Sequence, residues 1–130
     1  MMIGLIAFGG GALTLPARRA RAIDWESFSW PPFEAAHAEA IPVVIAFQSE
    51  SCVVCKGQRG LLDDVLSEPS FAMFLRFRVD FDRQRDVAEK LNVHEHGTVL
   101  AQICYEEIGR LVGDIEAKQL RRLLEKTQAA

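Results

Sequence analysis

The sequence predicts a single α/β domain, and three features of its pattern carry that prediction. Residues 43–47 are a continuous run of β-branched, aromatic and small apolar side chains, which is typical of a strand buried on both faces. Apolar residues between positions 61 and 66 recur at helical spacing, and residues 75–79 alternate between apolar and basic side chains as a strand does. Read along the whole chain, the predicted order is β-α-β-α-β-β-α after one N-terminal helix.

The other elements follow from start and stop signals in the sequence. They are a helix at 33–40 that Pro31-Pro32 precede, a further turn at 70–74, a helix capped by Asp82 that ends at 91, antiparallel strands at 98–102 and 108–112, and a last helix at 116–126. That last helix places Leu120, Leu123 and Leu124 on one apolar face. Trp25, Phe28 and Trp30 could form an exposed binding surface, but we interpret them as anchors that pack the N-terminal segment on the core.

Composition limits the classes of function. The 130 residues are enough for one hydrophobic core, and 49% hydrophobic with 25% charged residues is ordinary for a soluble globular protein. A net charge of −3 leaves no basic stripe to neutralise phosphates, so we expect no nucleic-acid partner. Three cysteines cannot form a disulfide scaffold, and at least one of them is unpaired within a monomer.

The first 22 residues differ from the rest. Residues 1–15 are apolar and Gly-rich, and as a helix they would span about 22 Å, less than the roughly 30 Å of a bilayer core. This length suits a signal peptide, and Ala20-Arg21-Ala22 fits a small-x-small cleavage site, although no basic residue precedes the apolar run. We therefore expect residues 1–22 to be a signal peptide or a short membrane anchor with weak membrane association, and the alternative is a cytosolic arm. The predicted location is periplasmic or otherwise exported.

Cys52 and Cys55 are the main candidates for chemistry. They form a Cys-x-x-Cys pair that follows the predicted strand at 43–47 and opens the next helix. In that context the pair indicates thiol–disulfide exchange. The alternative is a pair of buried core cysteines with no reaction to perform.

These features resemble the thioredoxin family. The resemblance covers residues 33–126 and rests on the motif at 52–56, on Val79-Asp80-Phe81-Asp82, on Leu91-Asn92-Val93 ahead of Gly97-Thr98, and on Gly113-Asp114. It implies a thioredoxin fold over residues 23–130, with a central mixed β-sheet flanked by helices on both faces. The sequence also resembles exported bacterial thioredoxin-like proteins and the thioredoxin domain of the membrane thiol–disulfide reductase, whose motif likewise has a valine after the first cysteine.

The resemblance and the position of the pair imply a role for each site residue. Cys52 at a helix N-terminus is the expected attacking thiolate, and Cys55, one turn further in, is the expected resolving thiol. Lys56 adds a modest positive potential. Val53, Val54, Gly97 and Thr98 are the expected supporting or substrate-contacting residues, and the redox-active disulfide needs no cofactor.

The sequence departs from the family pattern in three ways. Gly97 replaces the usual cis-proline, so a trans peptide is expected, because a cis bond without proline costs about 3 kcal/mol. Ala46 replaces the buried acid that would accept a proton from the resolving thiol. Ser51 and Val53-Val54 replace the usual tryptophan and glycine-proline, which points to a substrate range other than that of a general thioredoxin.

The three histidines and the third cysteine admit several interpretations. His94 and His96 flank Glu95 in the loop expected to face the redox pair. The default interpretation is a solvated loop; the alternatives are a Zn²⁺ or Cu⁺ site with Cys52 and Cys55, or a histidine that accepts a proton.

We expect His37 at the surface of the first helix. Cys104 is expected at the end of a strand or in the following turn, as a small apolar residue by default or as an exposed thiol. Four arginines between positions 76 and 85 alternate with Asp80, Asp82 and Asp86, which predicts a solvated mixed-charge face.

The sequence thus predicts a thiol–disulfide oxidoreductase of the bacterial cell envelope that acts on protein disulfides, with a protein substrate and a redox partner protein. Val53-Val54 does not stabilise a thiolate and Glu50 opposes one, so we expect the protein to act as a reductant. The alternative is a copper- or zinc-binding or chaperone-like module with weak redox turnover.

Overall fold

The computed structural model describes residues 24–130, so the expected signal peptide or anchor at 1–22 lies outside the described residues. The sheet has five strands in the order β1-β3-β2-β4-β5. The elements in chain order are β1 (Trp25–Ser27), α2 (Trp30–Ala38), β2 (Val43–Gln48), α3 (Val53–Leu66), a 3-10 turn (Pro69–Phe71), β3 (Leu75–Asp80), α4 (Arg85–Lys90), β4 (Thr98–Ile103), β5 (Glu106–Val112) and α5 (Ala117–Ala129).

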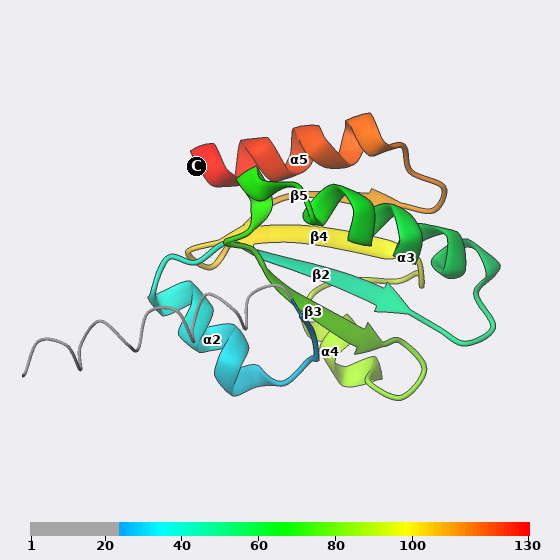
Figure 1. The fold of residues 1–130 in the computed structure, drawn as a ribbon. Coiled ribbons are helices and arrows are strands. Elements are labelled where there is room, and N and C mark those ends of the chain that lie inside the picture. The colour runs from blue at the N-terminus through cyan, green and yellow to red at the C-terminus, as the bar shows by residue number, and fades with distance from the viewer. Residues whose placement is uncertain (1–23) are drawn as a thin grey trace, which may run out of the picture.

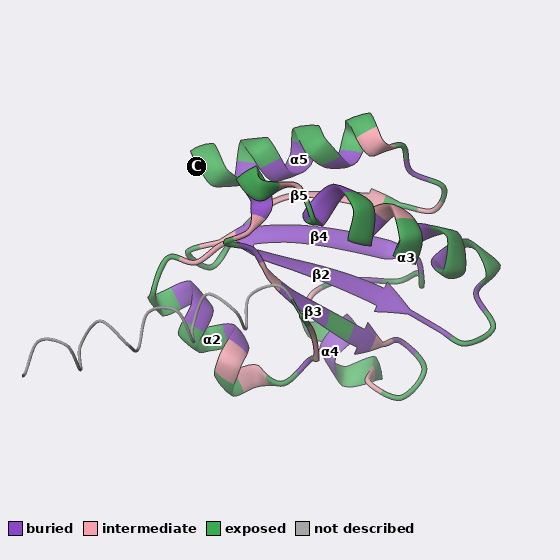
Figure 2. Cartoon of the chain, in the orientation of Figure 1, coloured by how far each residue is buried: buried purple, intermediate pink, exposed green. Residues whose placement is uncertain are grey.

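The sheet is mixed and lies between two layers of helices, as the resemblance implies (Figure 1). β1 and β2 run parallel to β3, whereas β4 runs antiparallel to both β2 and β5. α3 and α5 cover one face and α2 and α4 cover the other. Figure 2 shows the buried residues concentrated in the inner strands and on the helix sides that face them.

β2 supplies both halves of the core. All six of its residues are buried, which confirms the predicted central strand. Because side chains alternate along a strand, Val43, Ile45 and Phe47 pack toward α2 and α4, while Val44 and Ala46 pack toward α3 and α5. The strand that leads to Cys52 is therefore held from both sides.

The C-terminal helix packs as predicted. Leu120, Leu123 and Leu124 are all buried, and Leu120 and Leu124 join the cluster beneath α3. Among the described residues, no helix is long and apolar enough to cross a membrane.

The N-terminal segment differs from the prediction in two ways. β1 was not predicted, because three residues at the sheet edge carry no apolar alternation. α2 begins at Trp30 rather than after the prolines, since Pro31 and Pro32 occupy its first turn, where a missing N–H costs nothing. Phe28 is buried and Trp30 packs against it edge-on, which confirms their interpretation as packing anchors.

Asp82 does not cap a helix. α4 begins three residues later, with Gln84 at its N-cap. The Asp82 carboxylate instead accepts a hydrogen bond of 2.6 Å from the Ser49 hydroxyl, in the loop before the cysteines. The capping prediction was wrong because a side chain distant in the sequence competes for the same carboxylate.

Arg76 is buried, so the prediction that it lies on a solvated face was wrong. Its Nη2 donates to the carbonyl oxygen of Leu66, the last residue of α3, at 2.6 Å. A cation is favourable at a helix C-terminus, where carbonyl groups lack helical partners. Burial nevertheless lowers the pKa of Arg76, which the charges of Asp63 and Asp24 oppose.

His37 is also buried, contrary to the surface position that we expected. Its Nδ1 accepts a 2.8 Å hydrogen bond from the Tyr105 backbone N–H, and its Nε2 lies 3.1 Å from Gln102 Oε1. Cys104 and Tyr105 form the turn between β4 and β5 with φ angles of 51° and 66°, a conformation that non-glycine residues rarely adopt. The neutral imidazole of His37 therefore holds a strained turn.

We predict that protonation of His37 destabilises the protein. Burial lowers its pKa from 6.5, and the hydrogen bond to Gln102 only partly offsets this. The unfolded chain then binds a proton more readily, so stability is complete above about pH 6.5 and declines as the pH falls below that value. Chemical denaturation at about pH 7.5 and 5.5 measures the loss.

The variant His37→Gln is the comparison. It should be less stable at neutral pH and should lose less of its remaining stability on acidification than the wild-type protein does. Equal losses in the two proteins would mean that other groups cause the pH dependence.

Candidate functional site

β2 and the loop that follows it bring the two cysteines to one edge of the sheet. β2 ends at Gln48, and three loop residues lead to Cys52. The Ser49 carbonyl oxygen accepts from Cys52 N–H at 3.1 Å, while the Ser49 hydroxyl contacts Ser51 and donates to Asp82. These bonds give the loop a defined path, because it is tied to its own backbone and to the segment after β3.

Cys52 and Cys55 are joined by a disulfide at the start of α3, with their Cα atoms 5.2 Å apart. Cys52 is the N-cap residue, and its Sγ accepts a hydrogen bond of 3.0 Å from Cys55 N–H. Only 2% of Cys52 and none of Cys55 is exposed to solvent. An N-terminal N–H that points at sulfur favours a thiolate over a thiol after the disulfide is reduced.

The loop before β4 faces this disulfide, as the resemblance implies. Gly97 donates its N–H to the Phe47 carbonyl oxygen at 2.7 Å, and a Cβ atom on Gly97 would lie 4.0 Å from Cys52 Sγ. The φ angle of Gly97 is +81°, which suits glycine, and residues 24–130 contain no cis peptide bond. The expected trans peptide at Gly97 is thus confirmed. Thr98 is buried and donates its hydroxyl to the Glu95 carbonyl oxygen.

Gln58 fastens this loop to α3, and the sequence interpretation missed it. Its side-chain Nε2 donates to the carbonyl oxygens of Gly97, at 2.7 Å, and Gly113, at 2.5 Å. Gln58 lies three residues after Cys55, so both face the same side of the helix; this spacing was the available signal. Its Oε1 is buried without a hydrogen-bond partner among the described residues, a cost that the two donated bonds offset.

The two loop histidines have different positions. One ring nitrogen of His96 lies within 4.8 Å of both cysteine sulfurs. The His96 ring is exposed on one side and packs edge-on against Phe81, with the ring centroids 6.0 Å apart. His94 lies outside this group, and its Nε2 contacts Asn92 Oδ1 at 3.1 Å. The structure thus brings His96, but not His94, to the cysteine pair.

The other predicted site residues form the rim of the site. Val53 and Val54 are 82% and 42% exposed, which is unusual for large apolar side chains. Lys56 is exposed on the first turns of α3. Ala46 is fully buried within the cluster beneath α3, so it offers the pair an apolar side chain and no proton acceptor.

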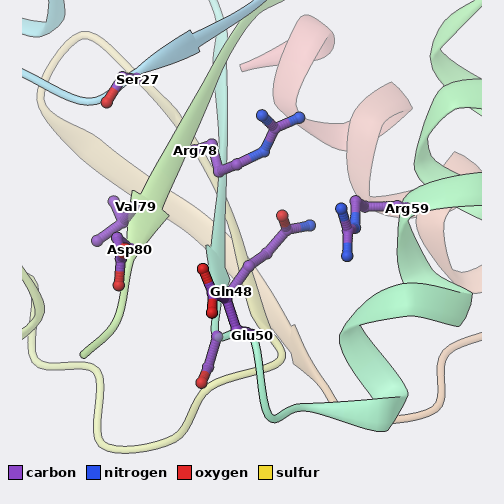
Figure 3. Close-up of a pocket in the computed structure, with 8 residues that line it drawn as sticks. Ser27, Gln48, Glu50, Arg59, Arg78, Val79 and Asp80 are labelled. Atoms are coloured by element: carbon purple, nitrogen blue, oxygen red, sulfur yellow. The ribbon is translucent and has the colours of Figure 1, made fainter. Parts of the chain in front are cut away.

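A cavity of about 290 Å³ lies beside the loop before Cys52 (Figure 3). The Gln48 side chain points toward the side of the cavity that Arg59 and Arg78 line, and Glu50 and Asp80 also line the cavity. Neither cysteine lines this cavity. Its mixed charges agree with the predicted solvated face at Arg78 and Asp80, and the cavity is distinct from the disulfide.

Cys104 lies in the turn between β4 and β5 and is an exposed free thiol. The predicted position in a turn is confirmed. Of the two interpretations of Cys104, a small apolar residue by default or an exposed thiol, the structure supports the exposed thiol.

Comparison with known proteins agrees with this geometry. No protein-family model and no curated protein matches the chain. Among solved structures, Trxlp from Edwardsiella tarda EIB202 is 26% identical with a TM-score of 0.74, and the match covers 78% of this chain and 98% of that one. Thioredoxin from Trypanosoma brucei brucei is 21% identical with a TM-score of 0.72, and the match covers 86% and 97%. The Malassezia sympodialis thioredoxin Mala s 13 is 19% identical with a TM-score of 0.70, covering 79% and 92%.

The chain therefore has a thioredoxin-like fold. A disulfide-bonded Cys52-x-x-Cys55 pair opens its α3 helix, next to the loop that contains Gly97. This fold and this pair together support thiol–disulfide oxidoreductase activity, with protein thiols as the general class of substrate and partner.

We predict that Gln58→Ala loosens the loop at Gly97. The substitution removes two hydrogen bonds, one to the buried Gly97 carbonyl and one to the half-buried Gly113 carbonyl, so the free energy of unfolding should fall by about 1–3 kcal/mol. Amide exchange at Gly97 and Gly113 should also become faster. Denaturant unfolding and hydrogen exchange measure the two effects.

Gln128→Ala is the matched control, because the exposed Gln128 amide makes a single bond to the Ser70 carbonyl oxygen. That variant should change stability by less than about 0.5 kcal/mol. If the two substitutions had equal effects, Gln58 would not be the residue that holds the loop.

Proposed function

We propose that this protein is a thiol–disulfide oxidoreductase of the bacterial cell envelope that reduces disulfides in protein substrates. The observation that carries the proposal is the disulfide between the N-cap residue of α3 and Cys55. In this position one sulfur meets the N-terminal N–H groups of a helix while the other lies deeper, so the two thiols are chemically unequal.

The reaction begins with the pair in its dithiol form. The Cys52 thiolate attacks one sulfur of a substrate disulfide, which forms a mixed disulfide and releases the other substrate sulfur as a thiolate. The Cys55 thiolate then attacks Cys52 Sγ, which re-forms the Cys52–Cys55 disulfide and releases the second substrate thiolate. Two electrons pass to the substrate, which takes up two protons, and the dithiol of a redox partner protein reduces the pair again.

Cys52 takes the attacking role because of the contacts around its sulfur. The hydrogen bond from Cys55 N–H and the N-terminus of α3 favour its thiolate. Cys55 Sγ is fully buried and lies 4.0 Å from the Phe47 carbonyl oxygen, which disfavours a negative charge there. Gly97 adds no side chain above Cys52, so a substrate backbone can approach from that side.

The exposed valines support recognition of a protein substrate. Val53 and Val54 extend from the first turn of α3 next to the disulfide, where they offer apolar area to an unfolded or extended chain. The same residues supply no charge or hydrogen bond to the Cys52 thiolate. Strong oxidants in this chemistry stabilise the attacking thiolate heavily, so the absence of any such contribution from Val53 and Val54 supports the role of reductant.

The proposed location rests on residues 1–22 alone. The apolar run at 1–15 and the Ala20-Arg21-Ala22 sequence have the length and pattern of an exported protein's leader. Disulfides form and persist in such compartments, which gives a protein-disulfide reductase substrates to act on.

Trapping of mixed disulfides tests the proposed function. In the full-length chain with Cys104→Ser, which removes the exposed third thiol, Cys55→Ser should accumulate reductant-sensitive complexes with substrate proteins. Cys52→Ser is the matched control and should accumulate few, because it lacks the attacking thiol. The complexes should be enriched about ten-fold or more with Cys55→Ser, and fractionation should recover them from the cell envelope.

Two results would contradict the proposal in different ways. Equal trapping by Cys52→Ser and Cys55→Ser would overturn the assigned roles of the cysteines. Recovery of the complexes from the cytosol would overturn the location and leave the chemistry in place.

A further inference from the structure

The His96 ring completes a group of three metal-binding side chains. Its nitrogen and the sulfurs of Cys52 and Cys55 all lie within 4.8 Å of one another, and no other group of this kind occurs in the described residues. The proposed exchange reaction uses both sulfurs but gives the imidazole no role. His96 has no hydrogen-bond partner within residues 24–130, so a ring nitrogen is available for a ligand.

The donor set selects the kind of ligand. Two thiolates and one imidazole are soft or borderline donors, which favour Cu⁺ and Zn²⁺ over Mg²⁺ or Ca²⁺. Zn–S bonds of about 2.3 Å and Zn–N bonds of about 2.0–2.1 Å place neighbouring donor atoms roughly 3.5–4 Å apart. In the disulfide form the two sulfurs are at bonding distance and must move apart after reduction, whereas the His96 nitrogen already lies within 4.8 Å of both of them. Because the His96 ring is exposed, it can move the remaining distance.

The surroundings leave room for an ion. Gly97 carries no side chain, and even a Cβ atom there would be 4.0 Å from Cys52 Sγ. An ion can approach from the exposed side of His96, although the sulfurs themselves are buried. Phe81 packs edge-on against the His96 ring, which limits the orientations of that ring.

We propose that the dithiol form of this protein binds one thiophilic cation, Cu⁺ or Zn²⁺, through Cys52 Sγ, Cys55 Sγ and a ring nitrogen of His96. Three ligands satisfy Cu⁺, whereas Zn²⁺ keeps a water molecule as its fourth ligand.

Binding and disulfide formation exclude each other. A dithiol reductant must first supply two electrons and two protons to break the Cys52–Cys55 bond. On binding, each cysteine then releases its proton as its thiolate becomes a ligand, so one ion displaces up to two protons. The oxidised protein has no thiolate to offer and does not bind, which makes the site redox-gated.

Metal titration of the reduced protein tests this proposal. The Cys104→Ser protein is reduced, and the reductant is then removed under anaerobic conditions. The reduced protein is titrated with Cu⁺ or with Zn²⁺ in competition with a chromophoric chelator. Cu⁺, Zn²⁺ or both should bind with a stoichiometry of one ion per protein chain. His96→Ala should weaken that binding about ten-fold or more, since it removes one of three ligands.

His94→Ala is the matched control, because His94 lies in the same loop but outside the group. It should change the affinity less than two-fold, roughly the scatter expected for a residue that contacts no ligand. Circular dichroism confirms that each variant is folded. The disulfide form of the parent protein should not bind either ion.

Three outcomes would overturn the proposal. They are the absence of stoichiometric binding of both ions, equal affinities of His96→Ala and His94→Ala, and equal binding by the reduced and oxidised proteins. The titration contains no disulfide substrate. A protein that fails it can still form the mixed disulfides of the trapping experiment, so failure here is distinguishable from failure of the proposed function.

Discussion

The Phe47 carbonyl oxygen, at the end of β2, connects the parts of the site. It accepts the Gly97 N–H at 2.7 Å and lies 4.0 Å from Cys55 Sγ. Through it, the central strand of the sheet sets the distance between the disulfide and the loop that faces it. Gln58 secures the same loop from the side of α3. Because a cis-proline is absent at position 97, these backbone and amide hydrogen bonds define the loop, and glycine provides the left-handed conformation that they require.

Local sequence patterns were enough to predict the framework. The buried strand at 43–47, the Cys-x-x-Cys pair at a helix N-terminus and the leucines of α5 each leave a signal within a few residues, and the structure contains all three. The elements that were missed or misplaced have sequence signals that are short or ambiguous. β1 has only three residues, and Pro31-Pro32 can precede a helix or form its first turn.

Features that depend on distant partners could not be predicted in this way. His37 is buried because Tyr105, 68 residues later, needs an acceptor for its N–H in a strained turn. Gln58 has its function through carbonyl groups 39 and 55 residues away. Arg76 is buried because the end of α3 offers it a carbonyl oxygen. In each case the polar side chain looks like a surface residue until tertiary structure supplies its partner.

The central claim is that the Cys52–Cys55 dithiol reduces disulfides by thiol–disulfide exchange. The redox equilibrium of the Cys52–Cys55 pair tests this claim most directly. The Cys104→Ser protein, with a metal chelator present, is equilibrated with glutathione buffers, alkylated, and measured by mass spectrometry. We predict a two-electron transition with a midpoint below about −200 mV. A midpoint near about −120 mV, typical of strong oxidants, would contradict the role of reductant. A pair that stays dithiol across the whole range would contradict the oxidoreductase function itself.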